Sequence, residues 1–306
     1  MALVMPEAPA QIPPPIRVRD AGRATAPAAP AARAISALSV DVDDWGVAVL
    51  GPTAPLTERV VANTRRVLSL LAEFGVQGTF FVLGRVAEAY PHLLREIDAA
   101  GHEVACHGWG HELITRQTPS EFRRDVSRAL ATLATITGRR PIGYRAPAFS
   151  IVRATRWAGA ILAELGVRYS SSVFPFAGRR YGDARVPAEI HRWPEAPLVE
   201  FPPSVVQFAG RRWPIAGGGY FRLLPGWLAR AGLRRATRGG RPAMVYLHPY
   251  EFDTAEIGAL RRAGWPIPRR VGLMQSLFRG QVEARWRALL GRMRFGPARD
   301  VLADWL

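Results

Sequence analysis

Three groups of polar residues in this chain combine side chains that bind metals with side chains that move protons. The segment 41–44 reads Asp-Val-Asp-Asp, His107 and His111 are separated by three residues, and His248 precedes a proline. One carboxylate and two imidazoles form a ligand set for a divalent metal with room left for water. A further carboxylate and a further imidazole can then act as general base and general acid. Together these groups predict a metal-dependent hydrolase.

Each group directly follows a short apolar run that is typical of a buried strand. The runs are 37–40, 104–106 and 244–247. Strands of α/β enzymes deliver catalytic side chains to one edge of the sheet, where loops complete the site. Adjacent strand residues point to opposite sides, so Asp43 and Asp44 are expected to diverge, one toward the metal and the other as base. Alternatively, the pair only caps a turn, where aspartate is common.

Apolar runs and helical patterns alternate along the chain. Strands are predicted at 37–42, 78–83, 102–106, 142–145, 167–173, 198–201 and 243–247. Helices are predicted at 57–74, 86–100, 119–136, 153–165 and 225–236. This alternation predicts a parallel sheet or barrel with right-handed crossovers, and about seven strands is one fewer than in the eight-stranded barrel.

The remaining segments lack strand periodicity. Residues 174–197 and Gly217-Gly218-Gly219 are expected to form loops, and the Pro- and Ala-rich residues 1–34 a disordered tail. From residue 270 onward, apolar residues keep helical spacing in a basic segment. Such helices either pack on their own domain, which is the commoner arrangement, or lie on a membrane surface. We expect three parts: the tail, a barrel at 35–254 and a helical extension at 255–306.

Composition narrows the class of protein. The formal net charge is +16, but arginines are scattered without an aromatic-interleaved block, so we expect no nucleic-acid partner. The chain has one cysteine, Cys106, which excludes an internal disulfide and fits a buried strand better than a metal site. His102 begins the same strand, at the end away from His107, and is expected to be structural. We see no transmembrane segment and no export signal, which favours a cytoplasmic protein.

The order of these groups resembles the polysaccharide deacetylases with NodB homology, also called carbohydrate esterase family 4. The resemblance covers roughly residues 36–253 and looks closest to the exosortase-associated bacterial polysaccharide deacetylases. The motifs that carry it are SVDVDDW (39–45), GTFFVLG (78–84), GHEVACHG (101–108), YRAPAFS (144–150), GGGYFR (217–222) and YLHPYEFD (246–253). It implies an α/β fold, a distorted (β/α)7-type barrel, to which we add the C-terminal helical extension. It also implies a divalent metal, usually zinc, bound by Asp44, His107 and His111.

The same resemblance implies roles for three further residues in N-deacetylation of N-acetylhexosamine units. Asp43 would be the general base, Arg145 would orient it, and His248 would protonate the leaving amine. The oxyanion of the tetrahedral intermediate would lie against the metal and a backbone N–H near Phe149. Substrate contacts are expected from Trp45, Pro147, Phe149, Tyr220 and Leu247.

Three departures from the family pattern bear on these roles. Asp41 stands where the first motif usually has threonine, so the roles can shift within the triplet. Trp45 replaces a glycine beside the metal, which would reshape substrate access. The run Tyr169-Ser170-Ser171-Ser172 lacks the aspartate that normally orients the acid histidine, and we expect Asp183 or Glu200 to substitute.

The leading hypothesis is a metal-dependent N-deacetylase of a bacterial exopolysaccharide or its lipid-linked precursor. Aromatic residues near the predicted rim mildly favour a sugar: Trp45, Trp109, Tyr220 and Phe221. The alternatives are hydrolysis of a small non-peptide amide and a non-catalytic glycan-binding barrel. The expected partners are an N-acetylated glycan and, peripherally, an anionic membrane at its inner face, while the oligomeric state stays open.

Overall fold

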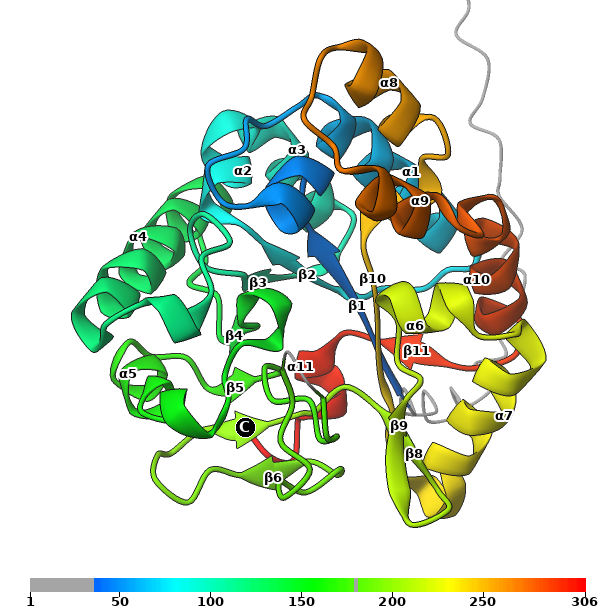
Figure 1. Ribbon diagram of the computed structural model, residues 1–306. Coiled ribbons are helices and arrows are strands. Elements are labelled where there is room, and N and C mark those ends of the chain that lie inside the picture. Colours follow the sequence, from blue (N-terminus) through cyan, green and yellow to red (C-terminus); the bar gives the residue numbers. More distant parts are fainter. Residues whose placement is uncertain (1–35, 179–180) are drawn as a thin grey trace, which may run out of the picture. The chain divides into compact units, whose positions relative to one another are not determined.

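A curled, mostly parallel sheet forms the centre of the computed structural model, which describes residues 36–178 and 181–306 (Figure 1). The strand order is β10-β1-β2-β3-β4-β5-β7-β6, and β11 also pairs with β1. Every pair in this sheet is parallel except β6 with β7. The strands are β1 (Ser36–Val42), β2 (Thr79–Val82), β3 (Glu103–Cys106), β4 (Gly143–Tyr144), β5 (Tyr169–Ser170), β6 (His191–Arg192), β7 (Val199–Glu200), β10 (Met244–Leu247) and β11 (Phe295–Gly296).

The prediction of a distorted α/β barrel is confirmed. Each of the seven predicted strands overlaps one strand of the sheet, although β5 is much shorter than the predicted 167–173. Sequence reasoning missed β6, β11 and a separate antiparallel hairpin of β8 (Val205–Phe208) and β9 (Arg211–Pro214). The disordered tail predicted at 1–34 lies outside the described residues, and the domain boundary at 254 stays a prediction.

Helices surround the sheet and follow most of the predicted spans (Figure 1). The predicted helix 86–100 is divided in two because Pro91 begins a new helix there. Gly217–Gly219, predicted as a loop, instead opens α6. The helices are α1 (Arg59–Glu73), α2 (Gly84–Ala89), α3 (Pro91–Ala99), α4 (Pro119–Thr137), α5 (Ala158–Glu164), α6 (Gly218–Leu223), α7 (Gly226–Ala236), α8 (Glu256–Arg262), α9 (Arg269–Ser276), α10 (Val282–Leu290) and α11 (Ala298–Val301).

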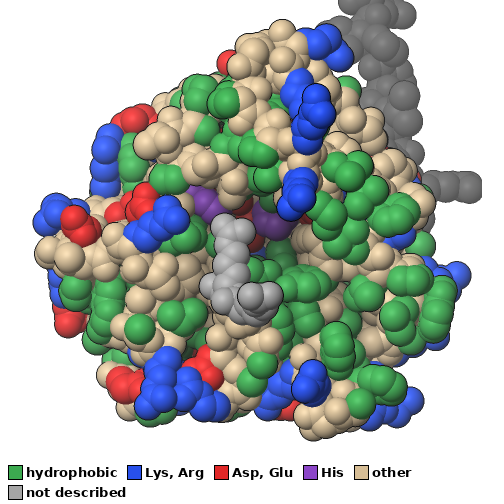
Figure 2. Space-filling model, in the orientation of Figure 1, with side chains coloured by type: hydrophobic (Ala, Val, Ile, Leu, Met, Phe, Trp, Pro, Cys, Tyr) green, Lys and Arg blue, Asp and Glu red, His purple; other side chains and the backbone are tan. Residues whose placement is uncertain are grey.

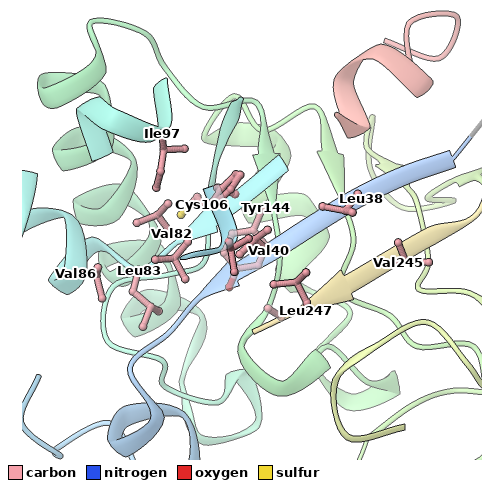
Figure 3. Packing of buried hydrophobic residues seen from close by; sticks show 14 of the residues in the cluster. Leu38, Val40, Val82, Leu83, Val86, Ile97, Cys106, Tyr144, Val245 and Leu247 are labelled. Atoms are coloured by element: carbon pink, nitrogen blue, oxygen red, sulfur yellow. The ribbon is translucent and has the colours of Figure 1, made fainter. Parts of the chain in front are cut away.

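Alternation along β1 divides the sheet into an outer and an inner face. Leu38 and Val40 belong to the large core under the helices, where they pack with residues such as Val82 and Leu247 (Figure 3). The intervening Ala37 belongs to a separate inner cluster. Because successive strand side chains point to opposite faces, the odd-numbered residues of β1 face the inside of the curled sheet. The same alternation governs which polar residues reach the site.

The C-terminal segment closes the inner face at the amino ends of the strands. Ala298 and Leu302 pack with Phe81 and Met244 in the inner cluster. The extension therefore contains helices, as predicted, but also β11 and this inner plug. Among the described residues, no helix combines the length and apolar character that crossing a membrane requires.

Candidate metal centre and active site

A cavity of about 340 Å³ opens at the carboxyl ends of the strands. Histidine side chains are visible in the corresponding hollow of Figure 2. The ionisable residues lining the cavity are Asp41, Asp43, His107, His111, Tyr181, Tyr220, Arg222, Tyr246, His248 and Tyr250. Strand alternation explains why two of the histidines reach the cavity. Cys106 and Leu247 pack in the outer core, so the following His107 and His248 turn inward.

Asp43, His107 and His111 form a buried cluster with the composition of a metal site. One ligand atom of each lies within 4.8 Å of the others. His107 Nε2 is 3.5 Å from Asp43 Oδ1, and His111 Nε2 is 3.6 Å from Asp43 Oδ2. The backbone at His111 has a φ of 66°, a strained conformation that is typical of functional sites.

The unpaired atoms of this cluster fit a divalent cation. Asp43 Oδ1 is buried without a hydrogen-bond partner, which is costly unless a cation satisfies it. His107 Nδ1 lies 2.8 Å from the carbonyl of Arg145, so this nitrogen carries the proton of the neutral ring and the Nε2 lone pair is left for a metal shared with Asp43. One carboxylate and two imidazole nitrogens also match the ligands of catalytic zinc sites.

The pKa values of Asp43 and His111 leave both groups deprotonated near pH 7, as metal binding requires. Burial opposes charging of Asp43, but His107 and His111 outweigh this effect and hold the pKa of the carboxyl below its usual range. Burial lowers the pKa of His111 to about 4, so that this imidazole is neutral near pH 7. Burial also opposes the charged form of His107, yet Asp43 raises its pKa above the ordinary value. Metal binding would have to displace that proton.

Asp44, predicted as the metal ligand, is not brought to the histidines. Its Oδ1 accepts from the amide of Gly46 at 3.0 Å, and its Oδ2 accepts from the amide and hydroxyl of Thr57 at 2.7 Å each. The physical reason is alternation, since Asp43 continues the inner face of β1 and Asp44 turns outward. The structure thus brings Asp43, not the predicted Asp44, to the two histidines, and Asp44 stabilises a turn.

Arg145 orients Asp41 rather than Asp43. Its Nη1 donates to Asp41 Oδ1 at 2.6 Å and to the Ser39 hydroxyl at 2.8 Å. Its remaining nitrogens donate to the backbone carbonyl of Ser171 at 3.1 Å and to its hydroxyl at 2.9 Å. The guanidinium is fully buried, and Phe81 covers it with a ring 4.2 Å away. This pair holds one oxygen of Asp41 in place and leaves the other free to face the cavity.

His248 lies between two carboxylates at the cavity wall. Its Nε2 is 3.8 Å from Asp41 Oδ2, and its Nδ1 is 3.4 Å from Glu251 Oε2. Burial opposes the charged form, but Glu251, together with the weaker effects of Asp41 and Asp43, outweighs burial and raises the pKa of His248. Tyr250 stacks on the imidazole at 4.9 Å and fixes its plane.

The partner of His248 is thus Glu251, not Asp183 or Glu200 as predicted. Asp183 pairs with Arg185, and Glu200 accepts from two backbone amides and the Trp193 indole. Both are therefore engaged elsewhere. The sequence itself contained a hint of this pairing. Pro249 starts a helical turn, and a glutamate three residues after the histidine then lies within reach of the ring.

Only two of the five predicted substrate contacts line the cavity, Phe149 and Tyr220. Trp45 is fully buried beneath a group of apolar side chains that includes Tyr250. Leu247 points outward into the main core by strand alternation. Pro147 is buried and does not line the cavity. The amide of Phe149 itself donates to the carbonyl of Ala146 at 3.0 Å, and the oxyanion contact from a backbone N–H near Phe149 stays a prediction.

Two residues at the ends of β3 have structural surroundings, as predicted. Cys106 is buried, and burial raises the pKa of its thiol to about 12, so it offers no thiolate near pH 7. His102 Nδ1 accepts from the amide of Gly78 at 3.1 Å, and its ring contacts Phe80. Burial lowers the pKa of His102 to about 4.

Comparison with protein-family models divides the chain into two matched regions. Residues 51–170 match the model described as polysaccharide deacetylase. Residues 171–303 match a domain of unknown function, DUF3473. The second region contains His248, Glu251 and the cavity-lining Tyr220, so both regions contribute to the site.

Similar proteins found by sequence and by structure also carry deacetylase names. The peptidoglycan deacetylase-like protein FGM2 of Gibberella zeae is 30% identical over 110 residues, which are 35% of this chain and 32% of the relative. A crystal structure assigned to the polysaccharide deacetylases, from Mycobacterium smegmatis, is 25% identical. It covers 85% of this chain and 92% of that chain with a TM-score of 0.54. The chain spans about one third of the length of the curated relative.

A structure with a different activity shares the fold. The crystal structure of PuuE allantoinase aligns with a TM-score of 0.56 at 15% identity, over 88% of this chain and 89% of that chain. At this identity the likeness shows the fold alone. Discrimination between sugar and small-amide substrates therefore depends on the site.

Proposed function

Because this chain carries a polysaccharide deacetylase region, we propose that the protein is a metal-dependent N-deacetylase. One observation carries the proposal. A buried Asp-His-His cluster, a carboxylate held by a buried arginine, and a histidine held by a glutamate all line one cavity. These are the parts that amide hydrolysis needs: a cation site, a base and an acid.

Asp43, His107 and His111 would hold the divalent metal, and zinc suits this donor set best. The bound metal would supply Lewis-acid polarisation of the acetyl carbonyl and of a water molecule. The protein's contribution is to bury the ligands and to fix their orientation. His107 is fixed by the Arg145 carbonyl, and Asp43 by its position at the end of β1.

Asp41 is proposed as the general base. Arg145 binds Oδ1, and Oδ2 faces His248 across the cavity. The carboxylate therefore takes a proton from the attacking water at Oδ2, while the arginine keeps it oriented. This assignment places the general base at Asp41, two residues before the predicted Asp43. Asp41 is also the position at which the first motif departs from the family pattern.

His248 is proposed as the general acid, with Glu251 as its positioning residue. The C–N bond of the acetamide breaks as His248 transfers a proton to the leaving nitrogen, and acetate and a free amine result. Glu251 favours the charged imidazolium that must donate this proton. The mechanism therefore needs Asp41 unprotonated and His248 protonated in the same molecule.

The proposed substrate is an N-acetylhexosamine unit of a bacterial exopolysaccharide or of its lipid-linked precursor. Four tyrosines and a phenylalanine line the cavity and offer flat apolar faces and hydroxyls suited to a pyranose ring: Phe149, Tyr181, Tyr220, Tyr246 and Tyr250. Membership of the exosortase-associated subgroup is part of the same proposal, and the six sequence motifs support it.

The experiment is acetate release from a panel of N-acetylhexosamine oligomers, with metal quantified by elemental analysis on the same sample. The proposal expects release that stops with a chelator and returns with zinc. About one bound metal per chain without release from any sugar, but with hydrolysis of a small amide such as allantoin, would contradict the sugar assignment. A protein that binds no metal would contradict the whole mechanism.

A further inference from the structure

An exposed apolar patch borders the cavity on the side of α6, α7 and α9. Figure 2 shows hydrophobic side chains gathered beside the hollow that contains the histidines. The patch consists of Leu223, Trp227, Leu228, Leu273, Met274 and Phe278, each at least 40% exposed. Large apolar side chains that gather on a surface in this way mark an interaction site.

Hydrogen bonds from two arginines, the buried Arg222 and the half-buried Arg285, hold the segments of the patch together. Arg222 donates to the carbonyls of Gln275 and Leu277, at 2.6 and 3.1 Å, and so joins the end of α6 to the end of α9. Arg285 on α10 donates to three carbonyls at the end of α6, those of residues 221, 222 and 224. These bonds fix the relative positions of α6, the start of α7 and α9.

Phe278 is a patch residue with an unusual backbone conformation. Its backbone has a φ of 59°, a left-handed conformation that is strained for a bulky residue, while its side chain is 47% exposed.

Positive charge flanks the apolar residues. Arg269 and Arg270 are exposed on α9, four residues before Leu273 and Met274 respectively, so each lies on the same side of the helix as one patch residue. Neither arginine has a hydrogen-bond or ion-pair partner among the described residues. The formal net charge of the chain is +16. An apolar surface flanked by unpaired arginines complements an anionic bilayer.

We propose that this patch docks the protein on an anionic membrane surface, with the cavity mouth at the lipid boundary. Leu223 and Met274 belong to both the patch and the cavity lining, so docking would bring the cavity to the bilayer. Four of the six patch residues are leucine or methionine, and tryptophan is common at the bilayer interface, which favours lipid over glycan as the occupant. The inference rests on the proposed function in one respect: docking would select a lipid-linked glycan precursor.

Vesicle co-sedimentation of the full chain tests the docking surface. Phosphatidylcholine vesicles with and without phosphatidylglycerol serve as probes, at low and high salt. We expect binding only with phosphatidylglycerol, weakened by salt. The double variant Trp227→Ser/Leu273→Ser should bind about tenfold more weakly or worse. The control Phe208→Ser, equally exposed but at the end of β8 on the hairpin, should bind like wild type.

Charge is tested by a second matched pair. Arg269→Gln/Arg270→Gln should weaken binding by about tenfold and flatten its salt dependence, because each arginine near the bilayer contributes separately. Arg95→Gln/Arg211→Gln removes the same charge from exposed positions outside the patch and should have little effect.

Three results would overturn the docking proposal: no vesicle binding by wild type, equal loss in a patch variant and its control, or patch variants that only convert a dimer to a monomer in sedimentation velocity. Acetate release from a soluble oligomer is measured on the same proteins. We expect the Trp227/Leu273 variant to keep it. If wild type binds vesicles but releases no acetate from any glycan, the proposed function fails and the docking surface stands.

Discussion

Two buried carboxylates at opposite ends of the same sheet have opposite surroundings. Glu103, at the amino end of β3, accepts from the hydroxyls of Thr79 and Tyr169 and from the amide of Arg299. Asp43, at the carboxyl end of β1, has one oxygen without any hydrogen-bond partner. Burial alone therefore does not identify a functional carboxylate.

The two carboxylates differ in whether the chain itself supplies hydrogen-bond partners for all their oxygens. Folding surrounds Glu103 with donors from β2, β5 and α11, so both of its oxygens are hydrogen-bonded within the chain and it joins three parts of the fold. The neighbours of Asp43 are two imidazoles whose Nε2 atoms could share a metal with its carboxylate. A buried polar atom that the fold leaves unpaired is expected to have a partner from outside the chain.

The first prediction separates the base from the metal ligands. Asp41→Asn should lower kcat by about a thousandfold, because the general base is lost, yet keep the bound metal. Acetate-release kinetics and elemental analysis on one sample check both parts. Loss of metal in this variant would place Asp41 among the ligands and contradict the assignment.

The second prediction concerns the acid. Glu251→Gln removes the charge that raises the pKa of His248, so the pKa falls and the proton needed for the leaving group is lost at lower pH. The alkaline limb of the kcat profile should therefore move to lower pH, with a decrease in kcat of about tenfold to a hundredfold. A decrease in kcat by the same factor at every pH, without a shift of the alkaline limb, would mean that Glu251 acts only through packing.

The third prediction tests the satisfied end of the sheet. Glu103→Ala leaves three buried donors without an acceptor and should cost about 2–5 kcal/mol of unfolding free energy. Denaturant unfolding measures this cost. The folded fraction should keep its metal and its specific activity. Loss of metal at unchanged stability would show that the two ends of the sheet are not separate.

Sequence patterns predicted the seven main strands, because each is a short apolar run followed by turn residues. The two histidines of the cluster also followed from their spacing. The choice between Asp43 and Asp44 depended on one residue of strand register, which motif order does not settle but the outward Val40 and Val42 indicate.

Other features depend on contacts that local sequence does not contain. Strand β11 has two residues and exists because residues 295–296 pair with the start of β1. The β8–β9 hairpin turns at Ala209-Gly210, where both residues have positive φ, and the glycine there was the one local signal for a turn. Glu251 was overlooked because the family pattern directed attention to another strand.

The most direct test of the account compares adjacent residues. Metal content of wild type, Asp43→Asn and Asp44→Asn is measured by elemental analysis after identical purification. The account predicts about one divalent metal per chain in wild type and in Asp44→Asn, and almost none in Asp43→Asn. Retention of metal by Asp43→Asn together with its loss from Asp44→Asn would contradict the central claim.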